Sequence, residues 1–200
     1  MIEAIIFDLG DVFLNLNHQA SIDAFKKLGL KEWNDDLKAN ALLFETGKLD
    51  ELQFLEAVQT HIPNANLIEI RDAWNAIIGD FPLERLEFLE KLQNKYNIFL
   101  LSNTNPTHID KFEHRVGLTF AREFYAHFNK IYFSYETKVR KPDEAVFNLI
   151  LKQNNLKPNK TLFVDDTLEH IEVAKGLGIN TWQILVGQDD VTNLFDKKII

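Results

Sequence analysis

The chain has 200 residues, 46% of them hydrophobic and 26% charged, and a chain of this size buries about 70% of the surface that its unfolded form exposes, which excludes fibrous and disordered classes. Its formal net charge of -8 at pH 7 argues against nucleic acid as a partner, because like charges repel at long range. The absence of cysteine excludes disulfides and thiolate metal sites, so a bound metal must be held by carboxylate, carbonyl or imidazole groups.

The N-terminal residues lead directly into a short apolar run at 4–7 without a basic segment. No stretch of the chain reaches the ~20 apolar residues of a membrane span, and we therefore expect a soluble cytoplasmic protein that makes no membrane contact. The run at 4–7 ends abruptly at Asp8, which predicts a buried strand followed by a turn.

Residues 15–82 form the next segment, and it differs from the rest of the chain. Apolar residues recur there at helical spacing in four places, 22–28, 37–44, 52–58 and 67–77, and no strand pattern interrupts them. The segment is predicted to be a helical insertion between the first strand and the rest of the sheet.

Strand and helix patterns alternate in the remainder of the chain. Apolar runs at 98–101, 130–133, 161–164 and 179–186 are accompanied by helical patterns at 83–92, 145–150 and 168–177. The tail from 189 to 200 is predicted to form a small terminal helix. The runs are apolar on both faces, as expected for strands of a parallel sheet that is covered on both sides by helices. The predicted fold class is therefore α/β.

Polar side chains gather where the predicted strands end, which is where open α/β sheets bind their ligands. They are Asp8 after the first strand, Ser102 and Asn103 after the second, Asp165 and Asp166 after the fourth, and the basic pair Arg140 and Lys141 between them. Each cluster by itself has an ordinary explanation as a turn, a helix cap or a surface lysine. Together, the acids would repel one another strongly unless a cation were bound.

The kind of cation suggests the chemistry. A few carboxylates plus water and substrate phosphate are the usual ligands of Mg²⁺, and a serine hydroxyl, a backbone amide and a lysine suit phosphate oxygens. Asp8 would then be a nucleophile that attacks phosphorus and forms an aspartyl-phosphate, which water hydrolyses.

These motifs resemble those of the haloacid dehalogenase-like (HAD) hydrolase superfamily, and the resemblance runs over the whole chain. The four matching stretches, in order, are 7–12 (FDLGDV), 101–104 (LSNT), 140–143 (RKPD) and 163–166 (FVDD). The resemblance implies a Rossmann-like core of residues 1–14 and 83–200, and a helical cap of residues 15–82 that closes over the site and selects the substrate.

The resemblance also implies a role for each site residue. Asp8 would be nucleophile and metal ligand, with the Gly10 carbonyl and Asp166 as further ligands and Asp165 ligating or supporting. Lys141 would offset the negative charge between Asp8 and the phosphoryl group. That group would be held by Ser102 and Asn103. The implied activity is a Mg²⁺-dependent phosphatase acting on a small phosphorylated metabolite, such as a sugar phosphate or a nucleotide.

One position departs from the superfamily's commonest phosphatase pattern. Gly10 stands where a second aspartate usually acts as general acid/base, an assistance typically worth about 10² to 10⁴ in rate. Asp11 is the next residue, but a shift of one residue along a turn re-aims the side chain. Two alternatives follow: a metal-independent 2-haloacid dehalogenase, which Asp165 and Asp166 argue against, and a low-turnover protein that binds a phosphate ligand.

Other polar and aromatic residues receive ordinary interpretations. His170 follows Asp166 by one helical turn and could face the site, but it is predicted to be exposed or to support the site from behind. Glu45 and Gly47 lie in a connection of the cap that could approach substrate, and a plain turn is the favoured interpretation. Trp33 and Trp74 are predicted to pack inside the cap.

Overall fold

The strands form one parallel sheet in the computed structural model, which describes residues 1–197 and residue 200. Among these residues the sheet has five strands in the order β3-β2-β1-β4-β5. They are β1 (Ala4–Phe7), β2 (Asn97–Ser102), β3 (Lys130–Phe133), β4 (Thr161–Asp165) and β5 (Asn180–Gln183). The predicted α/β class is confirmed. The last strand is shorter than predicted, and Leu185 and Val186 beyond it are 46% and 60% exposed.

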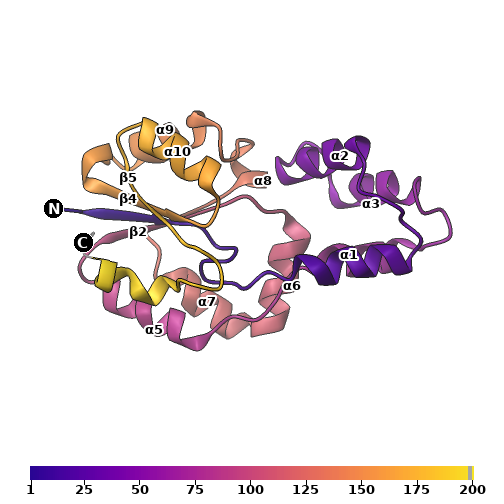
Figure 1. The fold of residues 1–200 in the computed structure, drawn as a ribbon, viewed down its shortest axis with the longest axis horizontal. Coiled ribbons are helices and arrows are strands. Elements are labelled where there is room, and N and C mark those ends of the chain that lie inside the picture. Colours follow the sequence, from indigo (N-terminus) through magenta and orange to yellow (C-terminus); the bar gives the residue numbers. More distant parts are fainter. Residues whose placement is uncertain (198–199) are drawn as a thin grey trace.

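Helices cover both faces of the sheet, and the alternation of side chains along β1 shows why. Ile5 and Phe7 pack in one apolar cluster and Ala4 and Ile6 in another, because successive side chains of a strand point to opposite faces. The first cluster lies under α5 (Leu83–Leu92), α6 (Pro106–Val116), α7 (Leu118–Ala126) and the 3₁₀ helix η2 (Val191–Lys197), and the second under α9 (Glu144–Gln153) and α10 (Leu168–Gly176) (Figure 1). This is the Rossmann-like layering that was expected.

Some elements differ from the sequence prediction. The tail that was predicted as a terminal helix over 189–200 is η2, and its residues 198 and 199 lie outside the described part of the chain. Helices α6 and α7, together with the short α8 (Ser134–Thr137) and the 3₁₀ turn η1 (Pro158–Lys160), were not predicted. In α6 the buried residues are Thr107, Ile109 and Phe112, a face too sparse in apolar residues to reveal a helical period.

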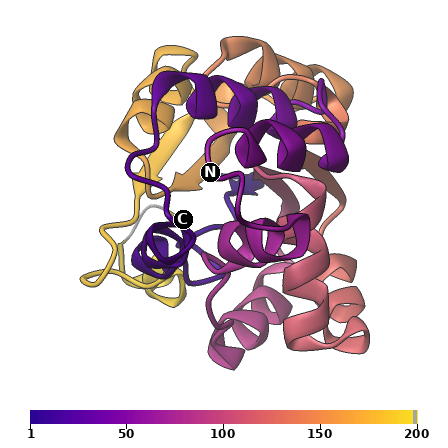
Figure 2. The same cartoon turned by 90° about the vertical axis from the view of Figure 1, so that its right-hand side faces the viewer.

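The insertion folds into helices α1 (His18–Lys27), α2 (Asp35–Glu45), α3 (Glu51–Gln59) and α4 (Leu67–Asn75). Side-chain caps fix where α2, α3 and α4 begin, at Asn34, Asp50 and Asn66. The helices enclose a separate apolar cluster that includes Leu37, Phe44 and Phe54. We call this unit the cap; Figure 2 shows its helices in front of the sheet, at the edge where the strands end.

Two linkers join the cap to the sheet and run side by side. The backbone of Asn15 donates to Asp80 O at 2.9 Å and accepts from Gly79 N at 2.9 Å, and Asn17 N donates to Ile77 O at 2.7 Å. A Cβ at position 79 would lie 2.3 Å from Asn15 O, so glycine is needed for this close approach. Within the described residues, no helix combines the length and the apolar character that crossing a membrane requires.

Candidate active site

The strand ends bring the predicted polar residues to one cavity between the sheet and the cap. Its volume is about 290 Å³. Its lining includes Asp8, Gly10, Ser102, Asn103, Lys141 and Asp166. Asp165 lies directly behind this lining and is fully buried. Residues at or just beyond the ends of β1, β2 and β4, more than 150 positions apart at the extremes, therefore share one cavity because parallel strands all end at the same edge.

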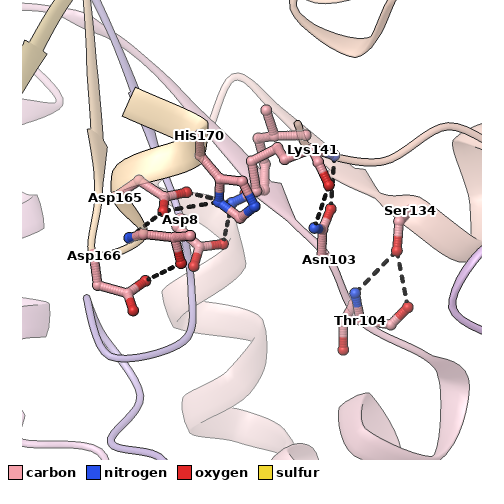
Figure 3. Close-up of polar contacts among 10 residues, drawn as sticks. Asp8, Asn103, Thr104, Ser134, Lys141, Asp165, Asp166 and His170 are labelled. Atoms are coloured by element: carbon pink, nitrogen blue, oxygen red, sulfur yellow. Dashed lines mark hydrogen bonds and ion pairs between the residues drawn. The ribbon is translucent and has the colours of Figure 1, made fainter. Parts of the chain in front are cut away.

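Lys141 is the centre of the polar network, and its side chain is completely buried. Its Nζ lies 2.7 Å from Asp8 Oδ1 and 2.6 Å from Asp165 Oδ2, and it donates to Leu101 O at 3.0 Å. Figure 3 shows Lys141 beside both carboxylates. Burial alone would lower the pKa of Lys141, but the charges of Asp165 and Asp8 outweigh it and raise that pKa. The ammonium group therefore remains charged and ties the strand ends together.

The two adjacent aspartates are held very differently. Asp165 Oδ1 accepts from Thr167 N at 2.8 Å and lies 3.0 Å from His170 Nδ1, while Oδ2 faces Lys141. Burial opposes ionisation of Asp165, but Lys141 and His170 outweigh it and lower its pKa to about 2. Both oxygens of Asp165 are thus engaged by protein donors. Asp166 is half-buried and lines the open cavity.

Three carboxylates lie close enough together to hold a divalent cation. Asp8, Asp165 and Asp166 each offer one oxygen, and the three oxygens lie within 4.8 Å of one another. Burial and the charge of Asp165 raise the pKa of Asp8 to about 7 in spite of Lys141, and burial and Asp165 also raise the pKa of Asp166. The raised pKa values follow mainly from burial of the carboxylates and, to a smaller extent, from the neighbouring charge of Asp165. Carboxylate oxygens of this kind fit Mg²⁺.

Asn103 and Ser102 occupy the end of β2. The Asn103 side chain does not point freely into the cavity: its Nδ2 donates to Lys141 O and its Oδ1 accepts from Lys141 N, both at 2.9 Å. The backbone amide of Asn103 is therefore the group of this residue that is left for a ligand. Ser102 is 4% exposed and lines the cavity.

The side chain of Leu16 packs against Gly10, the position at which the superfamily's phosphatases usually have a second aspartate. A Cβ at Gly10 would lie 2.8 Å from Leu16 Cδ1. The Asp11 carboxylate is engaged nearby, since Oδ1 accepts from Leu16 N at 2.9 Å and Oδ2 lies 3.8 Å from His18 Nε2. Asp11 has a φ of 52°, a left-handed conformation that turns its side chain toward the cap linker.

Several cavity-lining residues were given no role at the site in the sequence prediction. Glu45, His108, Arg140 and His170 all line it. Glu45 comes from the cap and was predicted to form a plain turn, and His170 was given no role. The sequence held a signal for two of them: His170 follows Asp166 by one helical turn, and Glu45 lies in a cap connection that could approach substrate. That Glu45 does reach the cavity depends on how the cap packs on the sheet.

Comparisons with known proteins agree with this geometry. A family model described as haloacid dehalogenase-like hydrolase matches residues 2–178. The D-ribitol-5-phosphate phosphatase of Bacteroides thetaiotaomicron is 29% identical over 195 residues, which are 94% of this chain and 95% of that protein.

Solved structures extend the comparison. A HAD family enzyme of the same species, crystallised as an aspartate-to-alanine mutant with magnesium and inorganic phosphate, matches with a TM-score of 0.86 and 30% identity over 98% of this chain and 99% of that chain. The L-2-haloacid dehalogenase of Xanthobacter autotrophicus matches with a TM-score of 0.61 and 17% identity over 100% of this chain and 84% of that chain. An identity of 17% shows that the dehalogenase and this chain share a fold and nothing more.

Proposed function

This chain belongs to the haloacid dehalogenase-like hydrolases, and we propose from that premise that it removes phosphate from a small sugar or polyol monophosphate. It is a Mg²⁺-dependent phosphatase of small phosphorylated metabolites, in line with the phosphatase and the magnesium–phosphate complex that it resembles over nearly its whole length. The polyol specificity is suggested by the ribitol phosphate substrate named for its relative.

The observation that carries the proposal is the contact of Lys141 with Asp8, at 2.7 Å, inside the cavity. An Asp8 carboxylate oxygen attacks phosphorus, a new P–O bond forms, and the ester P–O bond to the leaving alcohol breaks. The leaving alkoxide takes a proton from water, because Gly10 offers no acid. A second water then attacks the phosphorus of the aspartyl-phosphate, which releases inorganic phosphate and restores the Asp8 carboxylate. The Lys141 ammonium offsets the negative charge that gathers between Asp8 and the phosphoryl group.

The other cavity residues hold the phosphoryl group and the metal. We assign the Ser102 hydroxyl and the Asn103 backbone amide as donors to the phosphoryl oxygens. Asp8, the Gly10 carbonyl and Asp166 would hold Mg²⁺, which when bound offsets phosphate charge and orients the ester for in-line attack. We assign Asp165 to support: Lys141, His170 and Thr167 already engage both its oxygens.

Two further features are proposed with the activity. The substrate is a small metabolite and not a nucleic acid, in keeping with the net charge of -8 and a cavity of about 290 Å³. We also propose a cytoplasmic location, because phosphorylated metabolites are charged and are retained in that compartment.

The test is phosphate release from a panel of sugar, polyol and nucleoside monophosphates, with Mg²⁺ and with a chelator. We expect Mg²⁺-dependent release that Asp8→Asn lowers by at least about a thousandfold, because it removes the nucleophile. Asp72→Asn, the same change on the exposed surface of α4, controls for the substitution itself.

A parallel assay tests the alternative that the protein is a 2-haloacid dehalogenase. Chloride release from 2-chloropropionate that is insensitive to the chelator, with no phosphate release from the panel, would overturn the phosphatase assignment. Asp8→Asn with activity near that of the wild type would refute the role of Asp8 as nucleophile.

A further inference from the structure

An oppositely charged pair lies at the boundary between the cap and the core. Glu45 is the last residue of α2 in the cap, and Arg140 precedes Lys141 in the core. Glu45 Oε2 lies 3.3 Å from Arg140 Nη2, with side chains 23% and 34% exposed. Both residues line the same cavity as Asp8 and Ser102. The pair therefore shares the cavity in which the leaving group of a phosphate ester must lie.

The core fixes the position of Glu45 through the backbone around it. The Ser134 hydroxyl donates to Glu45 O at 2.7 Å, and Lys138 Nζ donates to Gly47 O at 2.9 Å. Gly47 has a φ of +61°, and a Cβ there would lie 2.3 Å from Tyr135 O. The turn after α2 is thus held closely on α8, and glycine is required for that contact.

Ser134 also joins this turn to the predicted phosphate-binding loop. Its Oγ accepts from Thr104 N at 3.0 Å, as Figure 3 shows. One buried hydroxyl therefore sets the distance between the cap turn and the loop after β2. The position of Glu45 relative to Ser102 follows from this connection.

The pair has hydrogen-bonding capacity to spare. Within the described residues, Glu45 makes no side-chain hydrogen bond or ion pair apart from the contact with Arg140, and Arg140 Nε is buried without an acceptor. A carboxylate can accept about four hydrogen bonds and a guanidinium can donate five. Burial raises the pKa of Glu45, partly offset by Arg140. Both groups are thus partly removed from water and incompletely paired.

We propose that Glu45 and Arg140 form the leaving-group subsite and select phosphate esters of hydroxyl-bearing chains. This inference rests on the proposed phosphatase function. Each hydroxyl of a diol both donates and accepts, so one hydroxyl donates to Glu45 while its neighbour accepts from Arg140. A leaving group without hydroxyls displaces water from both charged groups and returns no hydrogen bonds, which disfavours its binding.

The test compares D-ribitol 5-phosphate with n-pentyl phosphate, which has the same chain length and a poor alkoxide leaving group but no hydroxyls. Phosphate release at a fixed Mg²⁺ concentration gives kcat/KM for each. We expect the wild type to prefer the polyol ester by about a hundredfold or more. Glu45→Ala and Arg140→Ala should each lower that ratio at least about tenfold, mainly through KM for the polyol ester.

A matched control is available within the cap. Glu51 pairs with Arg71 at 2.9 Å and is 41% exposed, and neither residue is among those that line the cavity. Glu51→Ala removes the same type of ion pair at a distance from the substrate, so the ratio should stay at the wild-type value. If an alanine variant does not fold, as judged by thermal unfolding, Glu45→Gln and Arg140→Lys replace it in the same comparison.

The outcomes separate the subsite from the activity. If the wild type releases phosphate from both esters and the variants lose the same factor on each, the pair acts on the phosphate end and the subsite is wrong, while the phosphatase function stands. A wild type that does not discriminate between the two esters also overturns the subsite. If the wild type hydrolyses neither these esters nor p-nitrophenyl phosphate, the proposed function falls and the subsite falls with it.

Discussion

Asn103 and Lys141 are joined by two hydrogen bonds although 38 residues separate them in the chain. The Asn103 side chain is matched to both the N–H and the C=O of Lys141. This clamp fixes the backbone from which the Lys141 side chain reaches Asp8. The side chain of Asn103 therefore positions Lys141, and only its backbone amide is left for the proposed contact with phosphate.

Replacing Asn103 by alanine should lower both activity and stability. We expect a loss of about 1–3 kcal/mol in the free energy of unfolding, from two net hydrogen bonds, and a fall of about 10- to 100-fold in kcat/KM because the Lys141 ammonium is misplaced. Asn154→Ala removes an amide that donates to Tyr132 Oη and Ile150 O far from the cavity. That control should lose stability and keep kcat/KM. Wild-type kcat/KM in Asn103→Ala would contradict the clamp.

Replacing the adjacent acids Asp165 and Asp166 by asparagine should have opposite effects on the free energy of unfolding. Asp165→Asn weakens the pairing of a buried lysine and should cost about 3–5 kcal/mol in the free energy of unfolding. Asp166→Asn removes a carboxylate whose pKa is raised by burial and by Asp165, so the metal-free protein should be as stable as the wild type or more so. It should also lose the rise in melting temperature that Mg²⁺ gives the wild type. Equal Mg²⁺ stabilisation in Asp166→Asn would exclude Asp166 as a ligand.

His108 should make stability depend on pH in the acidic range. Burial lowers its pKa from 6.5 to about 4, although the contact with Trp74 O opposes the shift. Between these values the unfolded chain binds a proton that the folded protein does not, so stability is lost as the pH falls from 6.5 toward 4 and this contribution is complete above 6.5. The loss is at most about 3 kcal/mol.

The measurement is the difference in free energy of unfolding between the wild type and His108→Gln across that range. The contribution of His108 should appear as a difference that changes with pH below 6.5 and is flat above it. His114→Gln, at an exposed position of the same helix α6, is the matched control. A flat difference from pH 7 to pH 4 for His108→Gln would show that the ring is protonated freely in the folded protein.

The contact between Gly10 and Leu16 should show up as coupling between two substitutions. Gly10→Ala places a methyl group 2.8 Å from Leu16 Cδ1, and overpacking of this kind costs about 1–3 kcal/mol. In a Leu16→Ala background the cost should largely disappear, which a double-mutant cycle on the free energy of unfolding measures. Gly176→Ala, in helix α10 with nothing within 4 Å of the new Cβ, should instead be neutral or stabilising. Additive effects at Gly10 and Leu16 would contradict the contact.

Much of the fold is determined by local patterns in the sequence. The run at 4–7 is apolar at every position because both of its faces are buried, which is why a parallel strand could be predicted there. The cap helices were predicted from apolar spacing, while α6 was missed because its buried face includes Thr107. The convergence of Asp8, Lys141 and Asp166 on one cavity followed from the rule that parallel strands end at the same edge.

Tertiary structure decided what each converging group is free to do. Asp165 and Asp166 are neighbours with the same side chain. In the folded protein Asp165 pairs with Lys141 and His170, whereas Asp166 faces the cavity. Glu45 reaches the site through the docking of its turn on Ser134, a contact between residues 89 positions apart. Hydrogen-bond partners at such separations depend on how layers pack, and the local sequence does not encode that packing; it encodes which segments are buried and which ends are polar.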